Sequence, residues 1–346
     1  MKDRQTLEAV LDDVTTHYDV GQWWDVRPVE GGFRLATDSG ALLVEAAPDR
    51  SEASLRFQAM LLAHLDDRAY LAPRLVRTRA GRPWHRSVAG TVLVSEWVDG
   101  VVVDDASTRQ RRRSLQALAE YHAKVGTFPP RLRVQGGPTA FTLEQEGPAV
   151  LEAFTGLSGW HLDADGRRRL RGASSYLWRQ FSRGPELLAA GGATLPRLVI
   201  HGSFGRPAVI LGGGRPGYPA DGLRGFHAAR YDLRTLDLAA ALRAFARSGS
   251  GFDLDRCAEV MAAYDEVERL SPAEVAALPV ILRAQRLARV YRLTSEFVIR
   301  FADGGEPGRG VVHEIVRAAE AEADRLRWLE ENEGALMEAL ASSLVG

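Results

Sequence analysis

Residues 201–211 read His201-Gly-Ser-Phe-Gly-Arg-Pro-Ala-Val-Ile-Leu211, and the surrounding sequence is organised around this segment. An apolar run, Leu195 to Ile200, leads into it, and the apolar residues 209–211 are followed by three consecutive glycines. A short apolar segment near Leu223 comes next, and Asp237-Leu-Ala239 begins a stretch of helical character. Apolar runs separated by glycine-rich turns predict a loop, a strand, a tight turn, a second strand, a loop and then a helix.

This layout resembles the catalytic core of the aminoglycoside phosphotransferase family, which shares its kinase-like fold with choline kinases. That family reads His-Gly-Asp-Phe-His-x-x-Asn and an apolar residue, then a hairpin turn, then an apolar residue with Asp-Phe-Asp, and finally Asp-Leu-Ala. The positions that keep this frame are His201, Gly202, Phe204, Val209, Phe226, Arg230, Asp237, Leu238 and Ala239. The resemblance extends over roughly residues 25–300.

The resemblance implies an α+β, two-lobed protein-kinase-like fold with a cleft between the lobes. Residues 1–99 are expected to form the N-terminal lobe, a mainly antiparallel sheet with a helix. Residues 100–346 are expected to form a larger, mainly helical C-terminal lobe. In that lobe, residues 201–211 correspond to the catalytic loop and residues 223–231 to a remnant of the metal-binding loop.

The residues that carry the chemistry of the family are replaced. The catalytic Asp becomes Ser203, the metal-binding Asn becomes Ala208, and the metal-binding Asp becomes Gly225. In the N-terminal lobe, Glu45 stands where the family has a cation for the nucleotide phosphates, and Gln58 is nearest to the position of its Glu partner. A carboxylate close to a triphosphate would be repelled by it.

These replacements predict a catalytically degenerate member, because phosphoryl transfer needs magnesium ligands, a residue that positions the acceptor hydroxyl and a cation on the phosphates. We therefore expect no cofactor, weak or absent magnesium-ATP binding and no phosphotransferase activity. The leading interpretation is a pseudokinase that binds a small molecule or peptide in the interlobe cleft. It would act as a binding or regulatory protein, with a biosynthetic enzyme as a possible protein partner.

The expected binding residues combine cations with polar groups that suit an anionic or peptide ligand. They are His201, Ser203, Arg206, His227 and Arg230. Arg230 has a second interpretation, a structural ion pair with Asp237.

Two other functions stay open at this point. Ser203, His201, His227 and Asp232 come from loops that converge in the family fold, so they can form a Ser-His-Asp arrangement with non-kinase chemistry, or the last three can hold a metal. The sequence has no nucleophile elbow, and the alternative is that these residues pack an inherited loop. The second function is an atypical small-molecule phosphotransferase.

Periodicity and turn signals place the remaining elements. Residues 28–46 read as two strands joined by Asp38-Ser-Gly40, and Gly31-Gly32 is either the family's nucleotide-covering loop or a plain turn. His122 is expected to cap or pack a helix. Further strands are predicted at 72–78 and 91–98, and helices at 4–19, 51–65, 107–124, 142–155, 165–183, 237–247, 254–268, 271–299 and 310–342.

Composition describes an ordinary globular protein of 346 residues with a net charge of −1. This charge gives no reason to expect a nucleic-acid or anionic-membrane partner, and no run approaches the roughly 18 apolar residues of a membrane span. The single cysteine, Cys257, excludes an internal disulfide and a cysteine-based zinc site. With a charged start that lacks an apolar signal core, these features favour the cytoplasm.

Overall fold

The computed structural model describes residues 4–29, 32–47, 51–87, 90–129, 146–159, 161–183, 195–213, 216–301 and 308–342. They belong to two compact units. The first unit contains residues 1–135, 197–245 and 263–269. The second unit contains residues 136–196, 246–262 and 270–346.

The first unit contains a six-stranded antiparallel sheet with the order β1-β2-β3-β6-β4, and β5 also pairs with β6. Its strands are β1 (Trp23–Val29), β2 (Gly32–Thr37), β3 (Gly40–Ala47), β4 (Leu75–Val76), β5 (His85–Ser87) and β6 (Gly90–Glu96). The turn predicted at Asp38-Ser-Gly40 does join β2 to β3. The sequence reading missed most of β1, whose two tryptophans are exposed and whose edge position tolerates Pro28.

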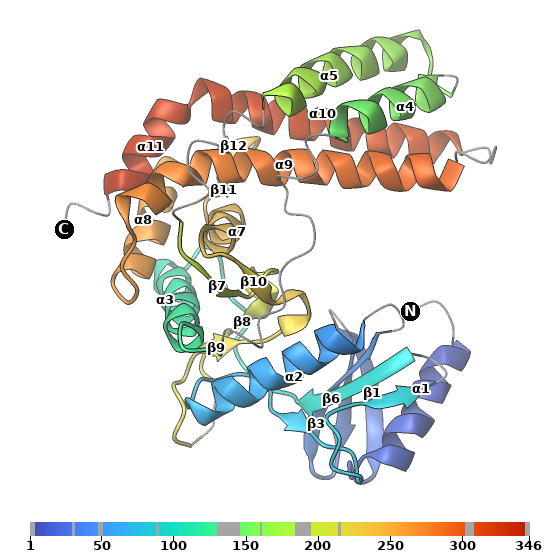
Figure 1. Ribbon diagram of the computed structural model, residues 1–346, viewed down its shortest axis with the longest axis vertical. Helices are drawn as coiled ribbons and strands as arrows, with labels where there is room; N and C mark the ends of the chain where they lie inside the picture. The colour runs from blue at the N-terminus through green and yellow to red at the C-terminus, as the bar shows by residue number, and fades with distance from the viewer. Residues whose placement is uncertain are drawn as a thin grey trace. The chain divides into compact units, whose positions relative to one another are not determined.

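Helix α1 (Arg4–His17) covers one face of this sheet, as Figure 1 shows. Its buried residues Val10 and Val14 pack with alternate residues of β2 and β3, such as Leu35 and Val44. Because side chains of a strand alternate between the two faces, Leu43 and Glu45 of β3 point the other way. That face is met by helix α2 (Glu52–Asp67), whose N-terminus is capped by the Ser51 hydroxyl.

The rest of the first unit follows the predicted order of loop, strand, turn, strand, loop and helix. Its elements are α3 (Thr108–Val125), β7 (Arg197–Ile200), the 3-10 turn η2 (Arg206–Ala208), β8 (Val209–Ile210), β9 (Gly222–Leu223), the 3-10 turn η3 (Phe226–Ala228), β10 (Arg230–Leu233) and α7 (Thr235–Phe245). Two antiparallel pairs, β7 with β10 and β8 with β9, flank the two loops formed by residues 201–208 and 224–229.

The second unit is mainly helical. Its elements are α4 (Gly147–Gly159), α5 (Ala164–Ser182), β11 (Arg247–Ser248), β12 (Gly251–Phe252), α9 (Pro272–Phe301), α10 (Arg309–Glu331) and α11 (Glu333–Ala341); α8 (Leu254–Asp265) begins in it. Helices α4, α5, α9 and α10 share one apolar core and lie side by side in Figure 1. A reciprocal capping box between Ser271 and Glu274 begins α9, close to the predicted start of this helix at residue 271. The predicted tail helix is two helices that meet at Asn332.

The antiparallel sheet and the many helices agree with the predicted α+β class. The division into lobes at Gly100 stays a prediction, and Gly31 of the proposed nucleotide-covering loop lies outside the described residues. None of the helices in the described ranges has the length and apolar character needed to span a membrane.

Candidate functional site

The loop that begins at His201 is fixed by a buried carboxylate, that of Asp237 in the first turn of α7. Asp237 accepts hydrogen bonds from the backbone N–H groups of His201 at 2.6 Å and Gly202 at 2.9 Å. A third partner is Nε2 of His122 at 3.1 Å, and Nδ1 of His122 contacts the Tyr264 hydroxyl at 2.7 Å. Burial alone would raise the pKa of Asp237, but the hydrogen bonds from His122 and from the backbone of Gly202, together with the electrostatic interaction with His122, favour the carboxylate and lower the pKa. The predicted capping or packing residue His122 is therefore a hydrogen-bonding anchor.

The imidazole of His201 lies directly behind Ser203. Its Nε2 is 2.9 Å from the carbonyl oxygen of Arg224, and because a carbonyl only accepts, this nitrogen carries the proton. Nδ1 is then an acceptor, and it faces the backbone N–H of Ser203 at 3.3 Å and the Ser203 hydroxyl at 3.4 Å. Burial lowers the pKa of His201, and attraction from Asp237 opposes this only in part. The imidazole is therefore neutral at pH 7.

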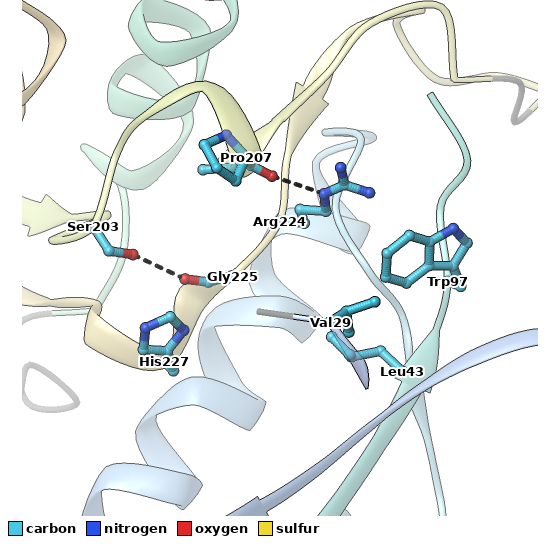
Figure 2. A pocket seen from close by; sticks show the side chains of 9 residues that line it. Val29, Leu43, Trp97, Ser203, Pro207, Arg224, Gly225 and His227 are labelled. Carbon is cyan, nitrogen blue, oxygen red and sulfur yellow. Dashed lines mark hydrogen bonds between the residues drawn. The ribbon is translucent and has the colours of Figure 1, made fainter. Parts of the chain in front are cut away.

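A cavity of about 270 Å³ opens in the first unit between the sheet and these loops. It is lined by Val29, Leu43, Trp97, Ser203, Pro207, Ala208, Arg224, Gly225 and His227. Figure 2 shows an apolar wall of Val29, Leu43 and Trp97 facing the loop residues. On the loop side, the Ser203 hydroxyl lies 3.3 Å from the carbonyl oxygen of Gly225. The cavity thus has one apolar side and one polar side.

Arg224 places a positive charge at the edge of the cavity. Its Nε donates to the carbonyl oxygen of Pro207 at 2.9 Å, and its guanidinium lies over the Trp97 ring, 4.8 Å from the ring centre. The Trp97 ring is itself held by a hydrogen bond of 2.8 Å from Nε1 to Asp99.

Two glycines give the loops their shape. Gly202 has φ +80°, and a Cβ there would lie 2.1 Å from the carbonyl oxygen of Ala228, so only glycine fits. Gly225, at the position of the family's metal-binding Asp, has φ +82° but open space around it, with His227 Nδ1 the nearest atom at 4.0 Å. The backbone conformation, more than the available volume, favours glycine at this second position.

The structure brings only some of the predicted site residues to the cavity. Ser203, Ala208, Gly225 and His227 line it, and His201 reaches it through Ser203. The remaining predicted residues do not line it.

Those remaining residues have other partners. Nε2 of Gln58 donates to the Glu45 carboxylate at 3.1 Å, and both side chains are buried. The two residues are therefore in contact, as expected for the positions that hold an ion pair in the family. Arg206 lies 3.5 Å from Asp105.

Asp232, which the sequence grouped with Ser203, His201 and His227, is bonded to other residues in the structure. Nε of Arg230 donates to Asp232 at 3.0 Å, which corrects the suggested ion pair of Arg230 with Asp237. Asp232 also accepts from its neighbour's backbone N–H at 2.9 Å and lies 3.7 Å from Arg197. The imidazole of His201 is oriented by a carbonyl oxygen, and the described residues do not bring His201, His227 and Asp232 within reach of one metal ion. The geometry therefore gives no support to a Ser-His-Asp triad or to this metal site.

Sequence reasoning missed Trp97 and Arg224. Arg224 could have been found from the sequence, because it stands just before Gly225, at a position where the family pattern has an apolar residue. Trp97 lies close to the predicted boundary between the lobes at residues 99 and 100, and it belongs to none of the motifs by which the sequence resembles the family. Val29 and Leu43 depend on strand register and pairing, which a single sequence does not fix.

Comparison with known proteins finds relatives by sequence and neighbours by structure. No protein-family profile matches the chain. Proteins named homoserine kinase are similar to it: that of Methylobacterium nodulans is 28% identical, covering 82% of this chain and 83% of the relative. That of Parvibaculum lavamentivorans is 27% identical, covering 84% and 86%.

Solved structures agree in fold. An aminoglycoside phosphotransferase from Alicyclobacillus acidocaldarius has a TM-score of 0.63 at 18% identity, covering 94% of this chain and 95% of that one. The amicoumacin kinase hAmiN, in complex with AMP-PNP, Ca²⁺ and Ami, has a TM-score of 0.64 at 14% identity, covering 93% of each chain. A microcompartment-associated aminopropanol kinase has a TM-score of 0.60 at 15% identity, covering 95% and 99%.

These findings correct two expectations. The pseudokinase interpretation, with its absence of phosphotransferase activity, is wrong as the leading interpretation, because the relatives that match most of the chain are named as kinases. The expectation that no cofactor is used is wrong as well, because those names imply a phosphoryl donor, and a structure of the same fold holds AMP-PNP and Ca²⁺. A cytoplasmic location and a protein partner stay predictions. The chain has the two-lobed protein-kinase-like α+β fold, and its neighbours in structure are aminoglycoside phosphotransferase-like kinases.

Proposed function

We propose that this chain is a small-molecule kinase that transfers the γ-phosphoryl group of ATP to the hydroxyl of a hydroxy amino acid or small amino alcohol. The observation that carries the proposal is the similarity to proteins named homoserine kinase over 82% of the chain. The neighbours in structure support it, since their names include an amicoumacin kinase and an aminopropanol kinase. Membership of the aminoglycoside phosphotransferase family is part of this proposal.

The cavity has the two kinds of surface that a nucleotide requires. Its apolar wall of Val29, Leu43 and Trp97 suits the faces of a base or ribose. Arg224 and His227 lie on the polar side and offer N–H donors to phosphate oxygens. The guanidinium is the stronger partner of the two, because its charge is permanent and its donors match two phosphate oxygens at once.

Ser203 is the residue placed to orient the acceptor. Its hydroxyl can donate either to Nδ1 of His201, at 3.4 Å, or to the carbonyl oxygen of Gly225, at 3.3 Å. In both cases the lone pairs of the hydroxyl oxygen stay available as acceptors. That oxygen can accept a hydrogen bond from the acceptor hydroxyl. Because burial lowers the pKa of His201, the imidazole takes up a proton poorly. The pair therefore positions the acceptor and does not act as a strong base.

The cavity does not fit a magnesium ion held by the protein. Magnesium is bound in proteins through one or two carboxylates beside the substrate phosphates. None of the nine residues that line the cavity in the described part of the chain carries a carboxylate. We assign neutralisation of the phosphate charge to Arg224, with His227 as a further hydrogen-bond donor.

The proposal is tested by incubating the full chain with ATP and a panel of acceptors: homoserine, threonine, 1-amino-2-propanol and an aminoglycoside. Formation of ADP is followed with and without each acceptor, in the presence of magnesium. Acceptor-dependent ADP formation with homoserine or the amino alcohol is expected. ADP formation that is the same with every acceptor and with none would contradict the proposal.

A further inference from the structure

A second group of ligand-type side chains lies away from the cavity, where α1 meets the strand β5. Asp13 and His17 are four residues apart on α1 and so share one face of the helix. His85, the first residue of β5, completes the group. Among the described residues, these three form the one group of three His, Cys, Asp or Glu side chains able to meet at one ion.

The backbone around the group is fixed. The carbonyl oxygen of His17 accepts from the backbone N–H of Arg79 at 2.8 Å, and Tyr18 pairs with Thr78 in a β-bridge. The Tyr18 hydroxyl donates to the carbonyl oxygen of Val92 at 2.8 Å, on the strand that pairs with β5. The last turn of α1 is thereby held against the sheet, so its two ligand-type residues keep their position relative to His85.

The side chains are arranged as ligands around a shared point. One ligand atom from each of the three residues lies within 4.8 Å of the other two. The imidazole rings of His17 and His85 are stacked with centroids 3.5 Å apart, and Nε2 of His85 lies 3.7 Å from Oδ1 of Asp13. That distance is longer than a hydrogen bond, so the two groups face each other without bonding directly. The other carboxylate oxygen of Asp13 is buried, and no described residue donates a hydrogen bond to it.

The donor set selects a class of metal. Two imidazole nitrogens and one carboxylate oxygen suit zinc and related divalent transition metals, whereas calcium and magnesium prefer oxygen ligands throughout. Tetrahedral zinc with bonds of about 2.0–2.1 Å needs ligand atoms roughly 3.3 Å apart. The ligand atoms here lie within 4.8 Å of one another, so zinc binding requires the side chains to rotate toward the ion.

We propose that Asp13, His17 and His85 form a site for a zinc-class divalent metal, with water as the fourth ligand, that joins the last turn of α1 to β5. The site is separate from the proposed kinase cavity and shares none of the residues that line it. The metal would cross-link two segments that are 68 residues apart in sequence, which the unfolded chain cannot do. Its loss therefore weakens the attachment of α1 to the sheet.

The test uses the full chain, freed of metal with a chelator and then titrated with zinc by calorimetry. One zinc per chain with a dissociation constant of about 1 μM or less is expected, with cobalt giving a tetrahedral absorption spectrum. His17→Gln, His85→Gln and Asp13→Asn should each weaken zinc binding by at least about 100-fold. The matched controls Asp12→Asn, next to Asp13 on the exposed side of α1, and His64→Gln should bind as the unmodified chain does.

A second measurement needs no variant. Histidines of the unmodified protein are carbethoxylated with and without one equivalent of zinc, and each site is quantified by mass spectrometry. Zinc should protect His17 and His85 and leave His64 unchanged. Absence of stoichiometric zinc binding, unchanged affinity in the three ligand variants, or equal modification of His17 and His85 with and without zinc would each overturn the proposal.

Discussion

Asp237 accepts a hydrogen bond of 2.6 Å from the backbone N–H of His201, which lies 36 residues earlier in the chain. The same carboxylate holds Gly202 and His122, so one buried charge fixes the start of the loop that carries Ser203. Asp237→Asn removes that charge and leaves its donors poorly matched. The free energy of unfolding should fall by about 3–5 kcal/mol, measured by urea denaturation.

The control for this substitution is Asp255→Asn, which makes the same chemical change at an exposed position on α8. It should change the free energy of unfolding by less than about 0.5 kcal/mol. Equal stability of the Asp237 and Asp255 variants would contradict the anchoring role of Asp237.

Two glycines of the same loop give a matched pair. Gly202→Ala places a Cβ 2.1 Å from a backbone oxygen at φ +80°, so the loop must move, at a cost of about 2–5 kcal/mol in stability. Gly205 has extended backbone with φ 178°, and its Cβ would meet only Pro207, at 3.8 Å. Gly205→Ala should therefore be tolerated, within about 1 kcal/mol of the unmodified protein in thermal unfolding. A reversed order of the two variants would show that the loop has a different backbone.

Stability should decrease in mild acid because His201 is buried as a neutral group. Its folded-state pKa lies below the ordinary value of 6.5, so the unfolded chain binds this proton first as the pH falls. The stabilisation is fully present above pH 6.5 and is lost as the pH falls from there through the folded-state pKa. His85 and His64, whose pKa values are also lowered, act in the same direction.

The measurement is the free energy of unfolding at several pH values between about 7.5 and 5, for the unmodified protein and for His201→Asn. The variant has no proton to bind at this position, so its stability should depend less steeply on pH, whatever its absolute value. Identical slopes for the two proteins would contradict the assignment of His201 as a buried neutral residue.

The sequence predicted the frame of the site better than its lining. Periodicity and turn residues located the 201–239 segment, the hairpin at Asp38-Ser-Gly40 and the start of α9, because each depends on neighbours along the chain. The cavity wall instead depends on which face of β3 Leu43 occupies and on the stacking of Arg224 on Trp97. Contacts of this kind join residues more than a hundred positions apart, and no local pattern encodes them.

The functional inference from the sequence failed for a related reason. Ser203, Ala208 and Gly225 line one cavity, but their identities were taken to mean loss of function. That interpretation considered only the catalytic groups that are absent from the sequence. It did not take into account the positive charge of Arg224 at the edge of the cavity. The similarity to proteins named homoserine kinase corrects this conclusion about function.

Arg224 should control nucleotide affinity. Arg224→Gln removes the permanent charge on the polar side of the cavity, so ATP and ADP should bind about 10–100-fold more weakly by calorimetry, as expected for loss of a charged hydrogen bond. Arg206→Gln is the matched control, because Arg206 pairs with Asp105 and does not line the cavity. It should leave affinity within about threefold of the unmodified protein. Equal weakening by both variants would mean that general surface charge, and not this contact, holds the phosphates.

The central claim is phosphoryl transfer to a small hydroxylated acceptor, and the most direct measurement is detection of the product itself. The full chain is incubated with magnesium, homoserine and ATP labelled in the γ-phosphoryl group, and the label is followed by mass spectrometry and ³¹P NMR. Arg224→Gln and heat-inactivated protein run beside it. The account predicts labelled O-phosphohomoserine, or the matching phosphate ester of another acceptor from the panel, formed by the unmodified chain and strongly reduced in the variant. If label reaches only inorganic phosphate or stays on ATP with every acceptor, the chain is not a small-molecule kinase.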